Sequence, residues 1–133
     1  MQQLNSLNKQ EIKIIEGLDE LVNLCHASSV EGGWWHNLDT GEKLNRNKGE
    51  LLMLIVSEIS EAMEAERKDL MDDKLPNRKG AEVELADAII RICDYAGAFQ
   101  LDLAGAILDK IEYNRNRADH KPENRRGVGG KKF

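Results

Sequence analysis

Apolar residues recur along the chain at intervals of three and four, which is the spacing of amphipathic helices. The intervals predict helices over about residues 8–29, 47–70, 79–99 and 102–118. Two of these segments begin with asparagine followed three residues later by glutamate, at Asn8 and Asn47, in the manner of a helix capping box. Short connections and the lack of a strand pattern in the sequence predict an all-α four-helix bundle.

Two segments lack helical periodicity. Residues 31–47 are rich in glycine and asparagine, carry both tryptophans and are expected to form a loop. Residues 119–133 are expected to form a basic, glycine-rich tail. A chain of 133 residues usually makes one domain, so we expect a single domain over 1–133, with its helical body over about 8–118.

The predicted second and third helices differ in how much of their surface is apolar. The third is apolar around most of its circumference and is expected to be buried. Three neighbouring helices cover such a helix poorly, so we expect the chain to self-associate. The second helix is expected to bury one stripe, formed by Leu51, Leu52, Ile55, Val56, Ile59, Ala62 and Met63.

Carboxylates interrupt the apolar surface of the third helix. Glu84, Asp87, Arg91 and Asp94 fall in a narrow wedge of that helix. Burying a carboxylate costs several kcal/mol unless a cation compensates it, and one arginine cannot neutralise three carboxylates. The wedge therefore predicts a divalent metal ion, with a salt-bridge network between helices around Arg91 as the structural alternative.

The predicted second helix carries a further pair of acids, Glu58 and Glu61, beside its apolar face. Such a pair by itself is common on the exposed surface of a helix. If the pair faces Glu84 and Asp87, four carboxylates gather between two helices. Ligands that are all oxygen suit Mg²⁺ or Mn²⁺ rather than zinc.

The predicted fourth helix offers a basic counterpart. Lys110, Asn114 and Arg117 share a stripe with apolar residues instead of facing away from the core. Lysine and arginine hold phosphate oxygens, and asparagine can fix a base, a ribose or a phosphate. The alternative is an ordinary basic helix end that complements the helix dipole. Together with the acids, the stripe predicts a site for Mg²⁺ and phosphate.

These segments resemble the MazG-like all-α nucleoside triphosphate pyrophosphohydrolases, especially the small single-domain forms of the phage type. The likeness covers about residues 48–133 and includes SEISEAMEAERK, EVELADAIIRICDYAG, KIEYNRNR and the terminal GGKKF. The family's motif is ExxE followed by ExxD. It matches Glu58 with Glu61 and Glu84 with Asp87, and 22 residues separate the two halves.

The resemblance implies hydrolysis of a nucleoside triphosphate between its α and β phosphates, which gives a monophosphate and pyrophosphate. Metal held by the four matched acids would polarise the reacting phosphorus and acidify a water molecule. Glu61 is the candidate that accepts the proton of that water, and Lys110 and Arg117 would offset charge on the leaving pyrophosphate. Deoxynucleoside triphosphates, with a lean to dGTP, are the expected substrates, and dUTP, dCTP and phosphoribosyl-ATP are alternatives within the superfamily.

Other residues remain as candidates. Trp34 and Trp35 are candidates for stacking on the base, although one or both could instead plug the end of the bundle. Lys131 and Lys132 either close over the phosphates or trail in solvent. Asp94 either supports the metal ligands or pairs with Arg91. Family members are homodimers or homotetramers, and the resemblance implies the same assembly here, with residues borrowed across the interface.

Charge and cysteine content narrow the class of protein. With 24 acidic and 19 basic residues, the net charge of −5 argues against binding to polymeric nucleic acid. Cys25 and Cys93 are expected to be reduced core residues. No stretch of the sequence predicts a membrane span or a signal peptide, so we expect a soluble cytoplasmic protein. A non-catalytic helical interaction protein, with its carboxylates in salt bridges, is the alternative from a different class.

Overall fold

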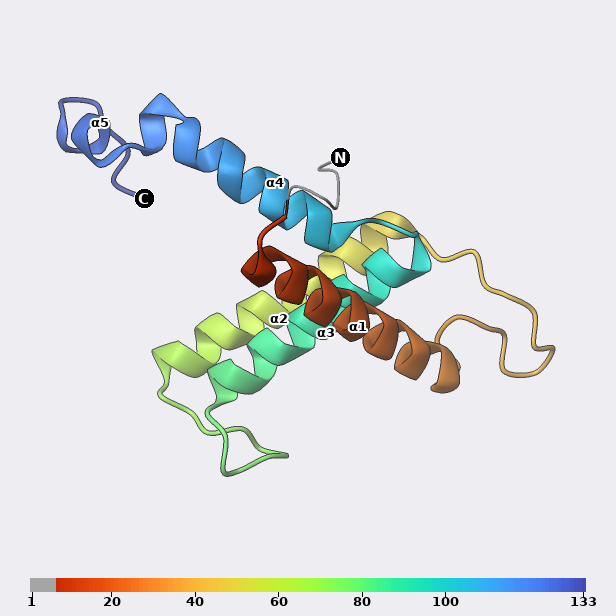
Figure 1. Ribbon diagram of the computed structural model, residues 1–133. Coiled ribbons are helices and arrows are strands. Elements are labelled where there is room, and N and C mark those ends of the chain that lie inside the picture. The colour runs from red at the N-terminus through yellow and green to blue at the C-terminus, as the bar shows by residue number, and fades with distance from the viewer. Residues whose placement is uncertain (1–6) are drawn as a thin grey trace. The chain divides into compact units, whose positions relative to one another are not determined.

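The computed structural model describes residues 7–133, and within that range all regular structure is helical (Figure 1). The helices are α1 (Lys9–Glu31), α2 (Lys48–Arg67), α3 (Gly80–Ala98), α4 (Leu103–Asn116), the 3-10 helix η2 (Ala118–His120) and α5 (Pro122–Arg126). The all-α class and the four main helices are therefore confirmed. None of the helices in the described range combines the length and the apolar character that crossing a bilayer requires.

Asparagine side chains begin two of the helices as the sequence predicts. The Oδ1 atom of Asn8 accepts a hydrogen bond from the backbone N–H of Glu11 at 2.8 Å, and its amide donates to the Glu11 carboxylate. At the start of α2, Oδ1 of Asn47 accepts from the backbone N–H of Glu50 at 2.9 Å. Each cap satisfies a backbone donor that the first helical turn leaves without a partner.

The chain divides into two compact units, and each is described by itself. One unit is Glu20–Leu101, which contains α2, α3 and the C-terminal part of α1. The other consists of the residues up to Asp19 together with Asp102–Phe133, and it contains α4, η2 and α5. The two halves of the predicted metal motif belong to the first of these units.

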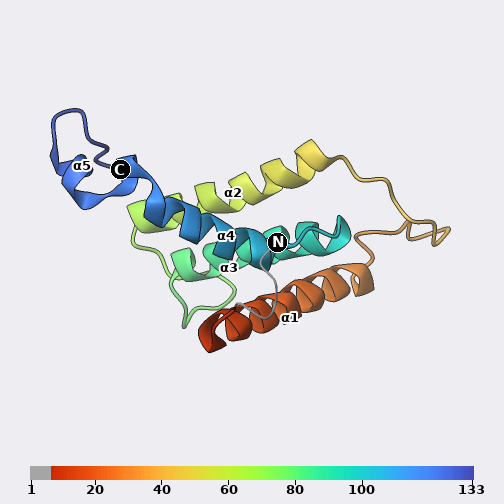
Figure 2. The same ribbon diagram turned by 45° about the horizontal axis from the view of Figure 1, so that its top comes forward.

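Within Glu20–Leu101, α2 and α3 lie side by side as a helical hairpin (Figure 2). The residues buried along them are small: Ala62 and Ala65 on α2, and Ala81 and Ala88 on α3. A Cβ atom added at Gly80 would lie only 2.9 Å from the Cβ of Ala65, so the first turn of α3 packs directly on α2. The absence of bulky side chains at these five positions lets the two helices, and their acidic residues, come close.

On the second helix, only part of the predicted stripe of large side chains is buried. Leu51 and Ala62 are buried, but four of the larger residues are 46% to 58% exposed in a single chain: Leu52, Val56, Ile59 and Met63. On α3, Leu85, Ile89 and Ile90 are also about half exposed. Within a single chain α2 and α3 pack through their small residues, which leaves the large apolar residues on another side of each helix, open to the expected self-association. We call these seven half-exposed residues the apolar face of the hairpin.

The C-terminal segment, predicted to be a basic, glycine-rich tail, contains η2 and α5. Pro122 occupies the first turn of α5, where its missing N–H costs no helical hydrogen bond. The guanidinium group of Arg125 donates to the backbone oxygens of Lys131 and Lys132, each at 3.1 Å. The last residues of the predicted basic, glycine-rich tail therefore fold back on α5.

Candidate metal centre

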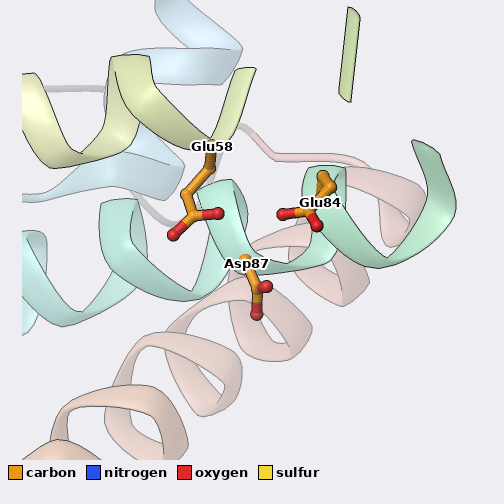
Figure 3. A group of neighbouring side chains, drawn as sticks. All are labelled: Glu58, Glu84 and Asp87. Atoms are coloured by element: carbon orange, nitrogen blue, oxygen red, sulfur yellow. The ribbon is translucent and has the colours of Figure 1, made fainter. Parts of the chain in front are cut away.

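Three carboxylates of the predicted motif meet between the two helices of the hairpin. Glu58 comes from α2, and Glu84 and Asp87 come from α3 (Figure 3). One oxygen atom from each of the three lies within 4.8 Å of the others. Glu84 points toward Glu58 in this view, as expected if the two acids share a ligand. Three of the four acids that the sequence assigns to one metal site are thus gathered by the fold.

The carboxyl group of Glu84 is the most perturbed member of this acidic cluster. Its Oε2 atom is buried and has no hydrogen-bond partner among the described residues. Burial, then hydrogen bonding to Glu58 and Glu61, and then repulsion from both acids raise the pKa of Glu84 from 4.5 to about 7. A buried carboxylate oxygen without a partner, held among like charges, is where a cation gives the greatest compensation.

Asp87 is perturbed in the same direction. Burial raises the pKa of the Asp87 carboxyl above its ordinary value, and repulsion from Glu58 raises it further. The nearby Arg91 guanidinium lowers this pKa in part, and Asp72 and Glu61 raise it. Asp72 is a buried residue of the loop between α2 and α3, and the sequence analysis did not single it out. Its Oδ2 atom accepts hydrogen bonds from the backbone N–H groups of two residues that follow it.

Arg91 neutralises only one of these acids. Its Nε atom donates to Oε1 of Glu58 at 2.9 Å, so the salt-bridge alternative applies to this pair. Within residues 7–133, no lysine, arginine or histidine nitrogen lies within 4.0 Å of the Glu84 or Asp87 carboxylate. The excess negative charge and the all-oxygen donor set fit a hard divalent cation, which Glu58, Glu84 and Asp87 would hold.

Glu61 lies outside this group of three. Its residue is exposed, whereas Glu58, one turn earlier, is buried. Glu61 is nevertheless close enough to contribute to the raised pKa values of both Glu84 and Asp87. The structure therefore places Glu61 at the solvent edge of the acidic cluster.

A cavity of about 500 Å³ adjoins the acids. Its lining includes Glu58, Asp87 and Arg91, together with Arg46 and Trp34 from the segment between α1 and α2. Such a volume lies within the range of small-molecule sites. Trp34 is 67% exposed, so its ring is open to a ligand, as the stacking role requires.

Trp35 is placed quite differently from its neighbour. It is only 4% exposed, and its Nε1 atom donates to Asp94 Oδ1 at 3.0 Å and to Ser29 Oγ at 3.1 Å. Nδ1 of His26 lies 2.8 Å from the same Asp94 oxygen. The burial favours the packing role of Trp35 over base stacking. Asp94 pairs with His26 and Trp35, and the expected pairing with Arg91 is not found among the described residues.

Sequence reasoning missed this hydrogen-bonded group. His26 and Asp94 lie 68 positions apart in the sequence. The contact depends on the close approach of α1 to α3, where a Cβ atom at Gly97 would lie 2.7 Å from that of His26. No local pattern signals such a contact. Cys25 and Cys93 are buried free thiols, as predicted.

The predicted phosphate-binding residues lie in the other unit and are described within it. The ammonium group of Lys110 lies 4.7 Å from the centre of the Tyr113 ring, and Arg117 lies 5.8 Å from the same ring. Oδ1 of Asn114 is buried and has no hydrogen-bond partner among the described residues. The stripe therefore contains one buried acceptor without a partner among the described residues.

Asp119 forms ion pairs with two of the predicted basic residues. It accepts from Arg117 Nη2 at 2.8 Å and from Lys131 Nζ at 2.7 Å. These two partners hold the pKa of the Asp119 carboxyl well below its usual range. Lys132 contributes its backbone oxygen to Arg125 and lies in the same folded segment. Both lysines are exposed, and the charge of Lys131 is partly matched by the Asp119 carboxylate.

The resemblance to MazG-like pyrophosphohydrolases therefore stays a prediction that rests on the motif residues. What the structure establishes is a small all-α protein with an acidic Glu and Asp cluster that could bind metal. Comparison of the chain with protein-family models, with curated proteins and with solved structures found no match.

Proposed function

We propose that this protein is a Mg²⁺-dependent pyrophosphohydrolase that cleaves a nucleoside triphosphate between its α and β phosphates. The observation that carries the proposal is Glu84, whose buried oxygen has no partner and whose pKa is raised to about 7 among acids from two helices. A structural salt bridge would have supplied this carboxylate with a cation from the chain. The adjoining cavity of about 500 Å³ supports the binding of a small substrate.

When bound, Mg²⁺ would supply Lewis-acid chemistry, with Mn²⁺ as a possible substitute. Glu58, Glu84 and Asp87 would hold the metal, and the exposed Glu61 would complete the set of four from the solvent side. In the reaction a water oxygen forms a bond to the α phosphorus, and the bond from that phosphorus to the bridging oxygen of the β phosphate breaks. Glu61 accepts the proton of the water because its solvent-facing position leaves its carboxylate free to do so.

Other residues bind and orient the substrate. Arg91 holds Glu58 in place through its 2.9 Å ion pair, and the open ring of Trp34 stacks on the base. The sequence motifs assign Lys110 and Arg117 to the leaving pyrophosphate, Asn114 to the sugar or the base, and Lys131 and Lys132 to the phosphates.

The proposed base specificity rests only on the resemblance to the MazG-like family. Deoxynucleoside triphosphates, and dGTP first, are the substrates that we propose. Hydrolysis of dUTP, dCTP or phosphoribosyl-ATP by the same acids is the alternative within this chemistry. The ranking of these substrates is a result of the experiment that follows.

Pyrophosphate release from a panel of nucleoside and deoxynucleoside triphosphates tests the proposal, with orthophosphate followed in parallel. We expect pyrophosphate without orthophosphate, dependent on Mg²⁺ or Mn²⁺ and abolished by EDTA. Orthophosphate as the first product would contradict cleavage between the α and β phosphates. Bound metal stabilises the folded state by linkage, so Mg²⁺ should raise the melting temperature if the site binds it. If no triphosphate and no phosphoribosyl-ATP releases pyrophosphate and Mg²⁺ gives no thermal stabilisation, the protein is instead a non-catalytic helical interaction protein.

We further propose that the protein is a homodimer or a homotetramer. The support is the apolar face of the hairpin, whose seven large side chains are each about half exposed in a single chain. Large apolar side chains exposed in such number on two neighbouring helices favour an interface. Light scattering coupled to size-exclusion chromatography is expected to give a mass of two or four chains, and the 15.0 kDa mass of one chain at all concentrations would refute the assembly.

A further inference from the structure

A second cavity, of about 360 Å³, lies in the same unit as the acidic cluster but is lined by other residues. It is bounded by the segment between α1 and α2 and by the C-terminal ends of α1 and α3, which contribute Val30 and Ala98. Among residues 7–133, Arg46 alone lines both this cavity and the larger one beside the carboxylates. We call it the second cavity.

The charge around the second cavity is positive, although the protein carries a net charge of −5. Lys43 and Arg46 line it, and none of its lining residues is acidic. In the part of the chain that the structure describes, neither side chain has a carboxylate oxygen within 4.0 Å. Two unpaired cations at one cavity favour an anionic ligand.

Two aromatic rings form part of the walls of the second cavity. The rings of Trp35 and Phe99 meet edge to face, with centroids 5.9 Å apart and planes at 79°. The Trp35 ring is buried, and the hydrogen bonds of its Nε1 atom to Asp94 and Ser29 hold it in place behind Phe99. The Arg46 guanidinium lies over the Trp35 ring at 5.3 Å, with its charge beside the aromatic wall. Flat apolar walls beside unpaired cations suit a planar heterocycle that bears an anionic group.

We propose that the second cavity binds a nucleoside monophosphate, with the phosphate at Lys43 and Arg46 and the base against Phe99, next to the buried Trp35. The volume of about 360 Å³ is near the lower end of the range for small-molecule sites, which suits one phosphate better than a triphosphate chain. The binding site stands on the geometry of the cavity alone. The choice of a monophosphate as ligand rests on the proposed function, because a monophosphate is the product of that reaction.

Binding of GMP to the full chain in EDTA tests this site without turnover. In a titration followed by ¹H–¹⁵N NMR, we expect GMP to shift the indole signal of Trp35 and the amide signals of Ala98 and Phe99. Guanosine and inorganic phosphate are expected to bind at least about tenfold more weakly than GMP, since each lacks one of the two recognised groups. Signals that move only around Trp34 and Ile90, which line the larger cavity, would overturn the proposal.

Variants separate the second cavity from the acidic cluster. Lys43→Ala removes an exposed cation and is expected to weaken GMP binding about tenfold without loss of fold. Lys74→Ala removes another exposed lysine, outside the cavity, and is its matched control with no expected change. Ala98→Leu fills the cavity and should abolish the shifts. Unchanged GMP affinity in both Lys43→Ala and Ala98→Leu would refute the site, whereas GMP binding in a protein that releases no pyrophosphate would refute only the proposed function.

Discussion

Replacing Asp87 with asparagine is expected to reduce pyrophosphate release by at least about 100-fold while the protein stays folded. Asparagine has nearly the same shape as aspartate, but it carries no charge and is a weaker ligand for Mg²⁺. In EDTA the thermal midpoint of the variant should equal or exceed that of the wild type. The raised pKa of Asp87 means that its ionised form destabilises the metal-free fold, so a neutral side chain removes that penalty. Activity assays and circular dichroism melting in EDTA measure the two effects.

Glu64→Gln on α2 is the matched control. Glu64 forms surface ion pairs with Arg67 and Lys68 at 3.2 Å and 2.9 Å, apart from the acidic cluster. Exposed pairs of this kind contribute little, so neither activity nor melting should change appreciably. Full activity in Asp87→Asn would show that Asp87 is not a ligand of the proposed metal. Loss of activity together with a lower melting point in EDTA would instead indicate a structural role for the carboxylate.

The affinity for Mg²⁺ is expected to fall about tenfold for each pH unit below 7 and to level off above it. The cause is Glu84, whose pKa of about 7 means that metal must displace a proton from this carboxyl at lower pH. The metal-free protein should respond in the opposite direction. Between pH 4.5 and about 7 the folded state binds more protons at Glu84 than the unfolded state, so stability falls as pH rises through this window.

Thermal melting across this pH range, with EDTA or with excess Mg²⁺, measures both trends. The stabilisation by Mg²⁺ should be largest above pH 7 and should shrink as the solution is acidified. Glu84→Gln, which cannot titrate, should flatten the fall in metal-free stability. An equal effect of Mg²⁺ at about pH 5 and about pH 8 would show that Glu84 is not among the metal ligands.

Local sequence patterns were sufficient for the helices and for part of the metal centre. The asparagine caps at Asn8 and Asn47 and the apolar spacing are local signals, and they placed the main helices correctly. The acids could be paired because helical periodicity puts residues three apart on one side of a helix. That Glu58 is buried and Glu61 exposed depends on how closely α2 approaches α3, which the spacing of the acids does not encode.

Tertiary contacts account for most of what was missed. The contact of His26 with Asp94 joins two helices far apart in the sequence. Trp35 and Trp34 are adjacent and chemically identical, yet only the turn that follows α1 decides which ring is buried. In the C-terminal segment, Arg125 bonds to backbone carbonyls, so the order there depends on contacts that amino-acid composition does not reveal.

The small residues between α2 and α3 determine the size of the proposed metal site. Mg²⁺ requires oxygen ligands at about 2.0–2.1 Å, whereas Ca²⁺ accepts about 2.3–2.6 Å and more ligands. Alanine methyl groups and Gly80 fix the distance between the two helices, and so they fix how far the Glu58 carboxylate stands from those of Glu84 and Asp87. Selection between a small and a large cation therefore depends on side chains that never touch the metal, and widening the helix pair by a few methyl groups would shift the preferred ionic radius upward.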